Sequence, residues 1–361
     1  MTLLPRPWLE QIHPYGPGLH ASTADGSMAS NESPLGASPH VTQALAKAAA
    51  LVHRYPDPLA NTLRSELARL HRVDPEQILI GNGSDELIFL LAWAYLAQGG
   101  HAVTADPAYR IDEISSQVVN ARVTKVPLAN WTHDLESMAS CQADIAYVVN
   151  PHNPTGTVVS RTVIERFVAT CRAKLVVIDE AYIDFTEAPE DATAMSLTGA
   201  ANVVVLRTFS KIHGLAGLRV GYLVAAPSIV ATLCKIRAPF SVGSLAQAGA
   251  LAALADPAHR SRIRDHTLRC RGELTQLLTQ AGYSVVPSQA NFVLVVADEE
   301  ELMTRLARRG ITARPGSTLG LPGTVRISIP SMQGMAQLAA ALSTDSADLP
   351  ATSAVTSTSQ S

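Results

Sequence analysis

Three short runs of apolar, largely β-branched residues recur along the middle of the chain, at 145–149, 175–178 and 203–206. Continuous runs of this kind are typical of strands that are covered on both faces, as in a parallel sheet. Each run ends at a cluster of polar, Gly or Pro residues. In open α/β sheets, ligands bind just beyond the carboxyl ends of the strands. The pattern therefore predicts an α/β fold with a mainly parallel sheet flanked by helices, and a site at these strand ends.

Helix-start signals stand before this sheet pattern. Ser38-Pro39 places an N-cap residue before a proline at the first helical position, which predicts a helix to about Val52. Asp57-Pro58 repeats the arrangement and predicts a second helix, with an apolar stripe formed by Leu59, Leu63, Leu67 and Leu70. A short apolar run at 77–80 then stops at a Gly-Asn-Gly turn, after which a further helix is expected.

The final third of the chain has a different pattern. We expect a long helix over about 257–281, strands at 283–286, 292–296 and 325–329, and a helix over about 299–309. This arrangement indicates a smaller α+β domain. The expected division is an N-terminal segment (1–37) that contributes to the small domain and the edge of the active site, a large domain (38–256), a small domain (257–342) and a disordered Ser/Thr/Ala-rich tail (343–361).

Composition and charge narrow the class of protein. Of the 361 residues, 47% are hydrophobic and 16% charged, which suits a globular protein with a sizeable core. A formal net charge of -3 gives no electrostatic reason to expect nucleic acid as a partner. The first residues lack the pattern of a signal peptide, and the most apolar run, 87–97, is shorter than the roughly 20 residues that cross a bilayer. We therefore expect a cytoplasmic protein without membrane contact.

The cysteines give no sign of a metal or disulfide framework. The four of them lie far apart and show no CxxC spacing: Cys141, Cys171, Cys234 and Cys270. This spacing predicts reduced thiols that are mostly buried, and no metal site.

The three strand ends carry polar groups that suit one cofactor. They offer an Asn in 150–156, an Asp with a Tyr in 179–182, and a Ser-Lys pair with a downstream Arg in 207–219. Pyridoxal phosphate needs an amine for its aldehyde, a carboxylate for its pyridine nitrogen and neutral donors for its phenolic oxygen. Its phosphate needs hydroxyls, backbone N–H groups and an arginine. The turn at 81–83 lacks the full glycine pattern of a Rossmann or P-loop nucleotide site.

Seven stretches, in order along the chain, resemble the fold-type I pyridoxal-phosphate aminotransferases, and most closely the histidinol-phosphate aminotransferase family. They are 31–36, 54–57, 81–86, 150–156, 179–182, 210–219 and 326–329. The resemblance implies an aspartate aminotransferase-like fold, with a large domain that binds pyridoxal 5'-phosphate and a smaller α+β domain. It also implies a homodimer with shared sites.

The resemblance assigns roles to single residues. The catalytic residues would be Lys211, which forms the Schiff base and moves the substrate proton, Asp179, which pairs with the ring nitrogen, and Tyr182, which bonds the phenolic oxygen together with Asn153. The other cofactor contacts would be Ser84 and Asp85 through their backbone, Tyr109 stacked on the ring, Thr208, Ser210 and Arg219 at the phosphate, and Tyr55 reaching the neighbouring subunit's cofactor. The substrate would contact Tyr15, Asn153 and Arg326.

The reaction implied is amino transfer between histidinol phosphate and 2-oxoglutarate, in histidine biosynthesis. Some positions depart from the family's usual pattern: Ser33, His152, which falls close to the site, and 313–320. The anionic Asp85 and Glu86 also stand where a phosphate is expected. Three alternatives stay open: an aromatic amino-acid aminotransferase acting on phenylalanine or tyrosine, a threonine-phosphate decarboxylase-like enzyme, and a non-catalytic binding protein of the same fold.

Overall fold

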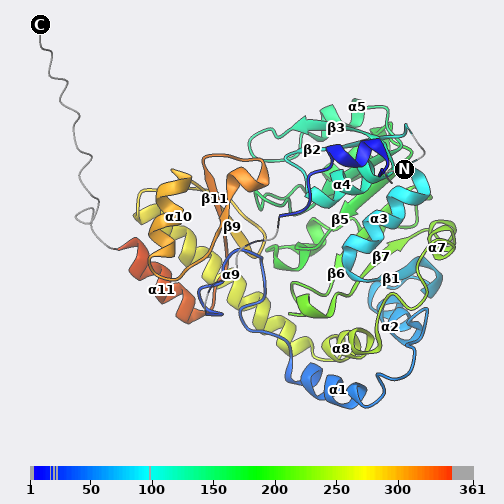
Figure 1. Ribbon diagram of the computed structural model, residues 1–361, viewed down its shortest axis with the longest axis horizontal. Coiled ribbons are helices and arrows are strands. Elements are labelled where there is room, and N and C mark those ends of the chain that lie inside the picture. Colours follow the sequence, from blue (N-terminus) through cyan, green and yellow to red (C-terminus); the bar gives the residue numbers. More distant parts are fainter. Residues whose placement is uncertain (1–3, 17, 19–20, 22, 97–98, 344–361) are drawn as a thin grey trace, which may run out of the picture.

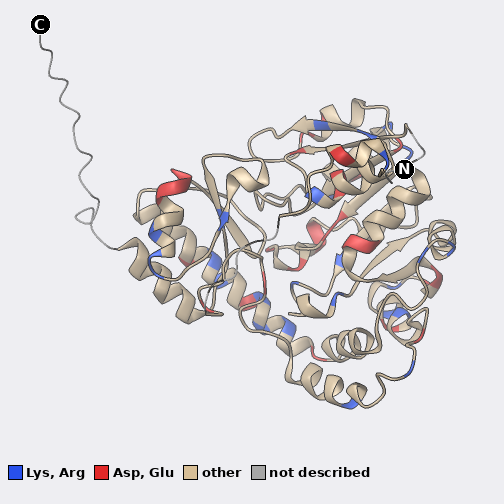
Figure 2. Cartoon of the chain, viewed as in Figure 1, with Lys and Arg blue, Asp and Glu red and all other residues tan. Residues whose placement is uncertain are grey.

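The computed structural model describes residues 4–16, 18, 21, 23–96 and 99–343, which form two units, each built on its own sheet (Figure 1). The larger sheet has seven strands in the order β1-β7-β6-β5-β4-β2-β3, and the smaller has four in the order β10-β11-β9-β8. Acidic and basic residues are spread over both units, and some lie at the centre, between the two sheets (Figure 2). The predicted fold class, a mainly parallel sheet with a smaller α+β unit, is confirmed.

The large sheet is parallel except at one strand. Its members are β1 (Ile78–Gly81), β2 (His101–Asp106), β3 (Arg122–Pro127), β4 (Ile145–Val149), β5 (Leu175–Asp179), β6 (Val203–Thr208) and β7 (Gly221–Ala225). The three predicted strands are β4, β5 and β6, which pair in parallel as neighbours. β7 runs antiparallel to both β6 and β1. The carboxyl ends of β4, β5 and β6 therefore open at one edge of the sheet, as predicted.

Helices cover both faces of the large sheet. They are α1 (Pro39–Ala49), α2 (Asn61–His71), α3 (Gly83–Tyr95), α4 (Arg110–Val118), α5 (Leu135–Ser140), α6 (Arg161–Thr170), α7 (Pro227–Cys234) and α8 (Ser244–Leu254). Alternate residues of one strand enter different cores: Val177 packs with residues of α3 and α7, while Val176 and Ile178 pack with residues of α5 and α6. Burial on both faces explains why these strands are continuously apolar.

Short 3-10 helices fill several of the connections. They are η1 (Pro7–Gln11), η2 (Pro75–Gln77), η3 (Ile183–Phe185), η4 (Pro189–Asp191), η5 (Met195–Leu197), η6 (Ala216–Leu218) and η7 (Gly316–Leu319). The last two lie beside segments that reach the site described below, in the turn that joins β6 to β7 and after β10.

The second helix begins later than predicted. The prediction that it starts at Asp57-Pro58 is wrong, because the Asp57 carboxylate accepts hydrogen bonds from the backbone N–H groups of Leu59 and Asn61 in a turn. Ala60 then adopts a left-handed conformation, with φ of 51°, so helical geometry begins only at Asn61. The predicted stripe is correspondingly shortened: Leu63 and Leu67 are buried, whereas Leu59 and Leu70 are exposed. The preceding helix ends at Ala49 rather than near residue 52, but its predicted cap at Ser38 is present.

The small unit combines the end of the chain with part of its beginning. It contains α9 (Pro257–Gln280), β8 (Ser284–Val286), β9 (Phe292–Val296), α10 (Glu299–Ala307), β10 (Arg314–Pro315), β11 (Thr324–Ser328) and α11 (Met332–Leu342). The strands pair antiparallel. Met28 is fully buried in this core, its N–H donates to the carbonyl of Thr312 at 2.9 Å, and its own carbonyl accepts from the N–H of Ser328 at 2.9 Å.

The division into domains remains a proposal. We keep residues 1–37 as a separate segment, with the large domain at 38–256 and the small domain at 257–342. The part of the segment near Met28 joins the small unit, whereas Trp8 of η1 donates a hydrogen bond to the carbonyl of Val118 in the large unit. The predicted disordered tail falls, after Ser343, outside the described residues.

The expected burial of the cysteines is wrong for most of them. All four are free, but only Cys270 is buried; Cys234 is exposed and the other two are half-buried. The reason is their position: Cys141 and Cys171 are the C-cap residues directly after α5 and α6, and Cys234 is the last residue of α7.

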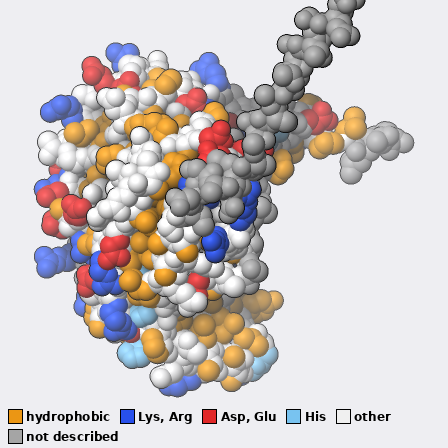
Figure 3. All heavy atoms as spheres, turned by 90° about the vertical axis from the view of Figure 1, so that its left-hand side faces the viewer, with side chains coloured by type: hydrophobic (Ala, Val, Ile, Leu, Met, Phe, Trp, Pro, Cys, Tyr) orange, Lys and Arg blue, Asp and Glu red, His pale blue; other side chains and the backbone are white. Residues whose placement is uncertain are grey.

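On the face formed by the small unit, acidic and basic side chains are interspersed with hydrophobic ones (Figure 3). Within the described ranges, no helix is both long enough and apolar enough to span a membrane.

Candidate active site

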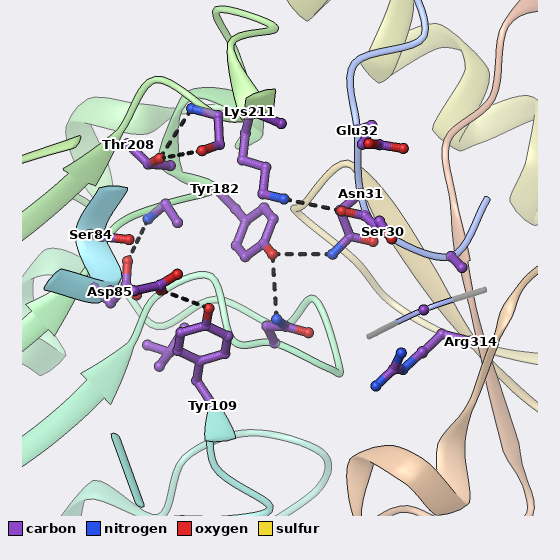
Figure 4. A pocket seen from close by; sticks show the side chains of 18 of the residues that line it. Ser30, Asn31, Glu32, Ser84, Asp85, Tyr109, Tyr182, Thr208, Lys211 and Arg314 are labelled. Atoms are coloured by element: carbon purple, nitrogen blue, oxygen red, sulfur yellow. Dashed lines mark hydrogen bonds between the residues drawn. The ribbon is translucent and has the colours of Figure 1, made fainter. Parts of the chain in front are cut away.

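A cavity of about 230 Å³ opens where the carboxyl ends of β4, β5 and β6 face the small unit. We call it the reaction cavity. Twelve of the predicted site residues line it: Tyr15, Ser84, Asp85, Tyr109, Asn153, Asp179, Tyr182, Thr208, Ser210, Lys211, Arg219 and Arg326. Figure 4 shows several of them converging from the large sheet and α3, with Ser30, Asn31 and Glu32 of the N-terminal segment beside them. The structure thus brings together residues that are more than 300 positions apart in the sequence, such as Tyr15 and Arg326.

Lys211 follows β6 and presents its amine to the cavity. Its Nζ atom donates a hydrogen bond to the carbonyl oxygen of Ser30 at 3.1 Å and lies 5.8 Å from the centre of the Tyr182 ring. Burial, followed by the positive charge of Arg326, lowers the pKa of Lys211 to about 8. A lysine with such a pKa is partly a neutral amine near pH 7–8, which suits it to attack a carbonyl group and to carry a proton.

Asp179 is the last residue of β5 and is buried. One oxygen accepts a hydrogen bond from the backbone N–H of Ala181 at 2.9 Å. Burial raises the pKa of this carboxyl to about 7, although the bond from Ala181 acts in the opposite direction. A protonated ring nitrogen placed against it would supply the positive partner that the carboxylate lacks. The position therefore fits a cationic heterocycle.

A hydrogen-bonded chain links Tyr182 to the small unit. The Tyr182 hydroxyl accepts from Asn31 Nδ2 at 3.1 Å and from Asn153 Nδ2 at 3.4 Å (Figure 4). Asn153 Oδ1 in turn accepts from the guanidinium of Arg326 at 2.5 Å. Tyr182 thus points into the cavity rather than packing only in the core. The sequence reasoning gave Asn31 no role, although it stands first in the family-like stretch 31–36; its backbone is left-handed, with a φ of 55°.

An anion cradle lies at the opposite side of the cavity from the small unit. The Thr208 hydroxyl donates to Ser210 Oγ at 3.0 Å, and Arg219 donates to the same oxygen at 3.4 Å. The N-terminus of α3 meets them: Gly83 has a φ of 73°, which favours glycine, and a Cβ at this position would lie 2.6 Å from a guanidinium nitrogen of Arg219. The cap residue of α3 makes no side-chain capping bond, which leaves first-turn N–H groups to bind an anion. These groups fit the phosphate of pyridoxal phosphate.

The two carboxylates near this cradle behave differently. Glu86 turns away, accepting hydrogen bonds from the Ser241 hydroxyl at 3.1 Å and from the backbone N–H of Asn82. Asp85 lines the cavity, where it accepts from the Tyr109 hydroxyl at 2.9 Å and pairs with Arg219 at 3.0 Å. Arg219 therefore faces one carboxylate and the cradle at once, and the repulsion expected from Asp85 is offset locally.

Two buried arginines form the wall contributed by the small unit. Arg314 of β10 and Arg326 of β11 are cross-strand partners, and each is only 6% exposed. The Nε atoms of both lack a hydrogen-bond partner, and neither guanidinium pairs with a carboxylate among the residues that the structure describes. Buried cations without counter-ions are costly, so this pair is built for an anionic ligand. Arg314 was missed, because the segment 313–320 gave no recognisable pattern.

Two predicted positions lie outside the reaction cavity. Tyr55 is 82% exposed and stacks on Phe240 with 4.6 Å between ring centres. His152, expected close to the site, is buried behind it: its ring nitrogens bond Thr155 Oγ1 at 2.8 Å and the Pro107 carbonyl at 3.2 Å. These two partners, one a side-chain hydroxyl and the other a backbone carbonyl, hold His152 within the loop, and it does not line the cavity.

Known proteins resemble this chain over most of its length. Residues 27–342 match the family model described as aminotransferase class I and II. The histidinol-phosphate aminotransferase of Symbiobacterium thermophilum is 42% identical over 308 residues, covering 83% of this chain and 84% of the relative. That of Moorella thermoacetica is 40% identical over 310 residues, covering 84% and 80%. A crystal structure of histidinol-phosphate aminotransferase from Sinorhizobium meliloti in complex with pyridoxal-5'-phosphate is similar with a TM-score of 0.83 at 28% identity, covering 93% of this chain and 95% of that one.

Proposed function

Because the chain belongs to the aminotransferase class I and II family, we propose that this pyridoxal-phosphate-dependent transaminase transfers an amino group between histidinol phosphate and 2-oxoglutarate, in histidine biosynthesis. The observation that carries the substrate proposal is the pair of buried guanidinium groups, Arg314 and Arg326, which face the cavity without a counter-ion. A phosphate or a carboxylate supplies the charge that they lack.

The residues of the cavity have the properties needed to hold pyridoxal phosphate. We assign its phosphate to Ser84, Thr208, Ser210 and Arg219, with the N–H groups that begin α3. Tyr55 of a second subunit would add a hydroxyl to this site. When bound, the cofactor acts as an electron sink that stabilises negative charge on the substrate α-carbon.

The ring of the cofactor would be held by side chains from three strand ends. We assign Asp179 to the ring nitrogen, because a buried carboxylate with a raised pKa is stabilised by a positive partner. Tyr182 and Asn153 would bond the phenolic oxygen, and Tyr109 would cover one face of the ring. Asp85 would be kept in place by Tyr109 and Arg219, away from direct contact with the phosphate oxygens.

Lys211 would move the proton of the reaction. With a pKa of about 8, its Nζ can accept a proton from the substrate α-carbon and return it at a neighbouring atom. The carbonyl of Ser30 holds the amine on the cavity side of the Tyr182 ring. The position of Lys211 between the two units would limit the access of water to the reacting atoms.

One anion subsite would serve both substrates in turn. Histidinol phosphate presents a phosphate and 2-oxoglutarate a carboxylate, and Arg314 with Arg326 can bind either. Tyr15 lies at this end of the cavity and would add a hydroxyl. The two half-reactions would then use the same wall of the small unit, with the acceptor entering after the keto product has left.

The protein would work as a homodimer in the cytoplasm. Large apolar side chains are exposed on the side that bears α1 and the connection to α2: Leu51, Val52, Tyr55 and Leu59, with Ile236 and Phe240. A surface of this kind suits a second copy of the chain. The hydroxyl of Tyr55 would then reach the anion cradle of the partner subunit.

The visible absorption spectrum of the purified protein tests the proposal. A yellow protein that loses its visible absorbance on addition of histidinol phosphate, without any amino acceptor, is the expected result. Loss of absorbance with phenylalanine alone would move the assignment to an aromatic amino-acid aminotransferase. Release of CO2 from threonine phosphate would indicate the decarboxylase. A protein that stays colourless when pyridoxal phosphate is supplied would overturn the proposal.

A further inference from the structure

A second cavity, of about 460 Å³, adjoins the reaction cavity. We call it the acidic cavity. It lies between the N-terminal segment, the turn after Lys211 and the chain that follows β11, and it shares Glu32, Ser210 and Ala216 with the reaction cavity. The two cavities therefore meet around these three residues. The function proposed above uses the two arginines of the small unit and the anion cradle, but it does not use the acidic cavity.

The acidic cavity has one sign of charge. Of the described residues that line it, the ionisable ones are Asp25 and Glu32. Asp25 is already engaged, since it accepts a hydrogen bond from the Ser331 hydroxyl at 2.5 Å. Glu32 is an exposed residue, and it makes neither a hydrogen bond nor an ion pair with any other described residue. Its carboxylate is therefore free to accept from a ligand.

The backbone beside Glu32 is firmly placed. The N–H of Asn31 donates to Ser328 Oγ at 2.8 Å, and its carbonyl accepts from Asn291 Nδ2 at 3.0 Å. Glu32 thus sits on a fixed segment that borders both cavities. It is close enough to the reacting amine that, of the carboxylates, it raises the pKa of Lys211 most.

The reaction cavity and the acidic cavity, taken together, carry opposite charges at their two ends. Arg314 and Arg326 form the positive end, and Glu32 the negative end, with the Lys211 amine reaching into the space that both border. Figure 4 shows Glu32 and Arg314 well apart on the same side of Lys211. An amino donor that complements these charges has an anionic group on one side of its amine-bearing carbon and a basic N–H group on the other side.

We propose that Glu32 determines donor specificity, by accepting a hydrogen bond from the ring N–H of an amino donor whose imidazole occupies the acidic cavity. The proposal rests on the function proposed above, and it names the residue that separates histidinol phosphate from substrates with a plain phenyl ring. A phenyl ring offers no N–H group, so it would enter the same space and leave the Glu32 carboxylate without a partner.

Two non-reacting probes test the proposal by direct binding. One is 3-(imidazol-4-yl)propyl phosphate, which is histidinol phosphate without its amine, and the other is 3-phenylpropyl phosphate. Calorimetric titration of the cofactor-loaded enzyme should show the imidazole probe binding about tenfold more tightly, which is the effect of one hydrogen bond to a charged group. In Glu32→Gln the preference should fall to about twofold or less, with the phenyl probe binding as before.

The controls separate the failure of this idea from that of the proposed function. Glu66→Gln, a surface change on α2 at a residue paired only with Arg69, should keep the full preference. In steady-state kinetics, Glu32→Gln should raise the KM for histidinol phosphate but not that for 2-oxoglutarate, which brings a second carboxylate instead of a ring. If the native enzyme uses histidinol phosphate and Glu32→Gln keeps the preference between the probes, Glu32 is not the determinant. If the native enzyme does not use histidinol phosphate, the proposed function itself falls.

Discussion

Replacing Arg314 with leucine should weaken the binding of anionic substrates while leaving the protein folded and able to hold its cofactor. Arg314 is buried, its guanidinium donates to the carbonyl of Gly16, and its Nε has no partner. Removing the guanidinium leaves no carboxylate of the protein without a partner, so the free energy of unfolding should fall only slightly. The variant should lose binding energy only when an anionic substrate is bound, because one arginine instead of two then contacts the anion.

The size of that loss follows from the contact removed. A hydrogen bond to a charged group contributes about 1.5–3 kcal/mol, which corresponds to roughly 10–150-fold in kcat/KM. Most of it should appear in KM, because Asn153 is held by Arg326 and keeps its position in this variant. Arg326→Leu is the contrasting case: it also frees the buried oxygens of Asn153 and Ala29, so kcat should fall as well.

Initial rates of glutamate formation, measured against each substrate in turn, give both constants. Arg314→Lys should recover part of the loss, since it keeps the charge without the paired N–H groups. If Arg314→Leu leaves kcat/KM within about twofold of the native value for both substrates, the arginine pair is not the anion subsite and the reasoning from unpaired buried charge is refuted.

Three further predictions concern the cofactor site. Lys211→Ala should abolish turnover while the circular dichroism spectrum and cooperative melting persist; retained activity would remove the central assignment. Since the pKa of Lys211 is about 8, its amine is mostly protonated below that pH, so pyridoxal phosphate should attach to cofactor-stripped protein roughly fifty times faster at pH 8 than at pH 6, and a flat stopped-flow profile would contradict this. Tyr55→Phe keeps the ring stacked on Phe240 but removes the hydroxyl, and it should speed cofactor loss about tenfold on dialysis. A fully active monomer in sedimentation would argue against the shared site.

The strands that were predicted are those whose burial on both faces leaves a continuous apolar run in the sequence. β4, β5 and β6 are covered on both faces, so each is continuously apolar and each ends at a polar cluster. β3 lies at the edge of the sheet and is mostly half-buried or exposed, so its run of residues 122–127 carries no comparable pattern. β7 is buried throughout. It follows directly on the glycine-rich segment that carries the cofactor residues, and for this reason residues 221–225 were not predicted as a strand.

The site was predictable to the extent that its residues follow strand ends. Asp179, Tyr182 and Lys211 do, and the parallel pairing of β5 with β6 brings them together. Arg314 and Asn31 do not. Arg314 reaches the cavity only through pairing with β11, and Asn31 through a left-handed backbone fixed by Ser328. Contacts between distant segments leave no local periodicity, so the hydrophobic pattern did not place either residue at the site.

The burial of Met28 in the small unit has a consequence for how the protein is made. The N-terminal segment leaves the ribosome first, but Asn31 finds its partner Ser328 only 297 positions later. At about 5–20 residues per second, synthesis separates them by roughly 15–60 s, during which the large sheet can fold. Through that interval the segment has no core to join and offers its apolar residues to chaperones. The pocket is thus among the last features to assemble, and a truncated chain would hold a folded sheet without a working site.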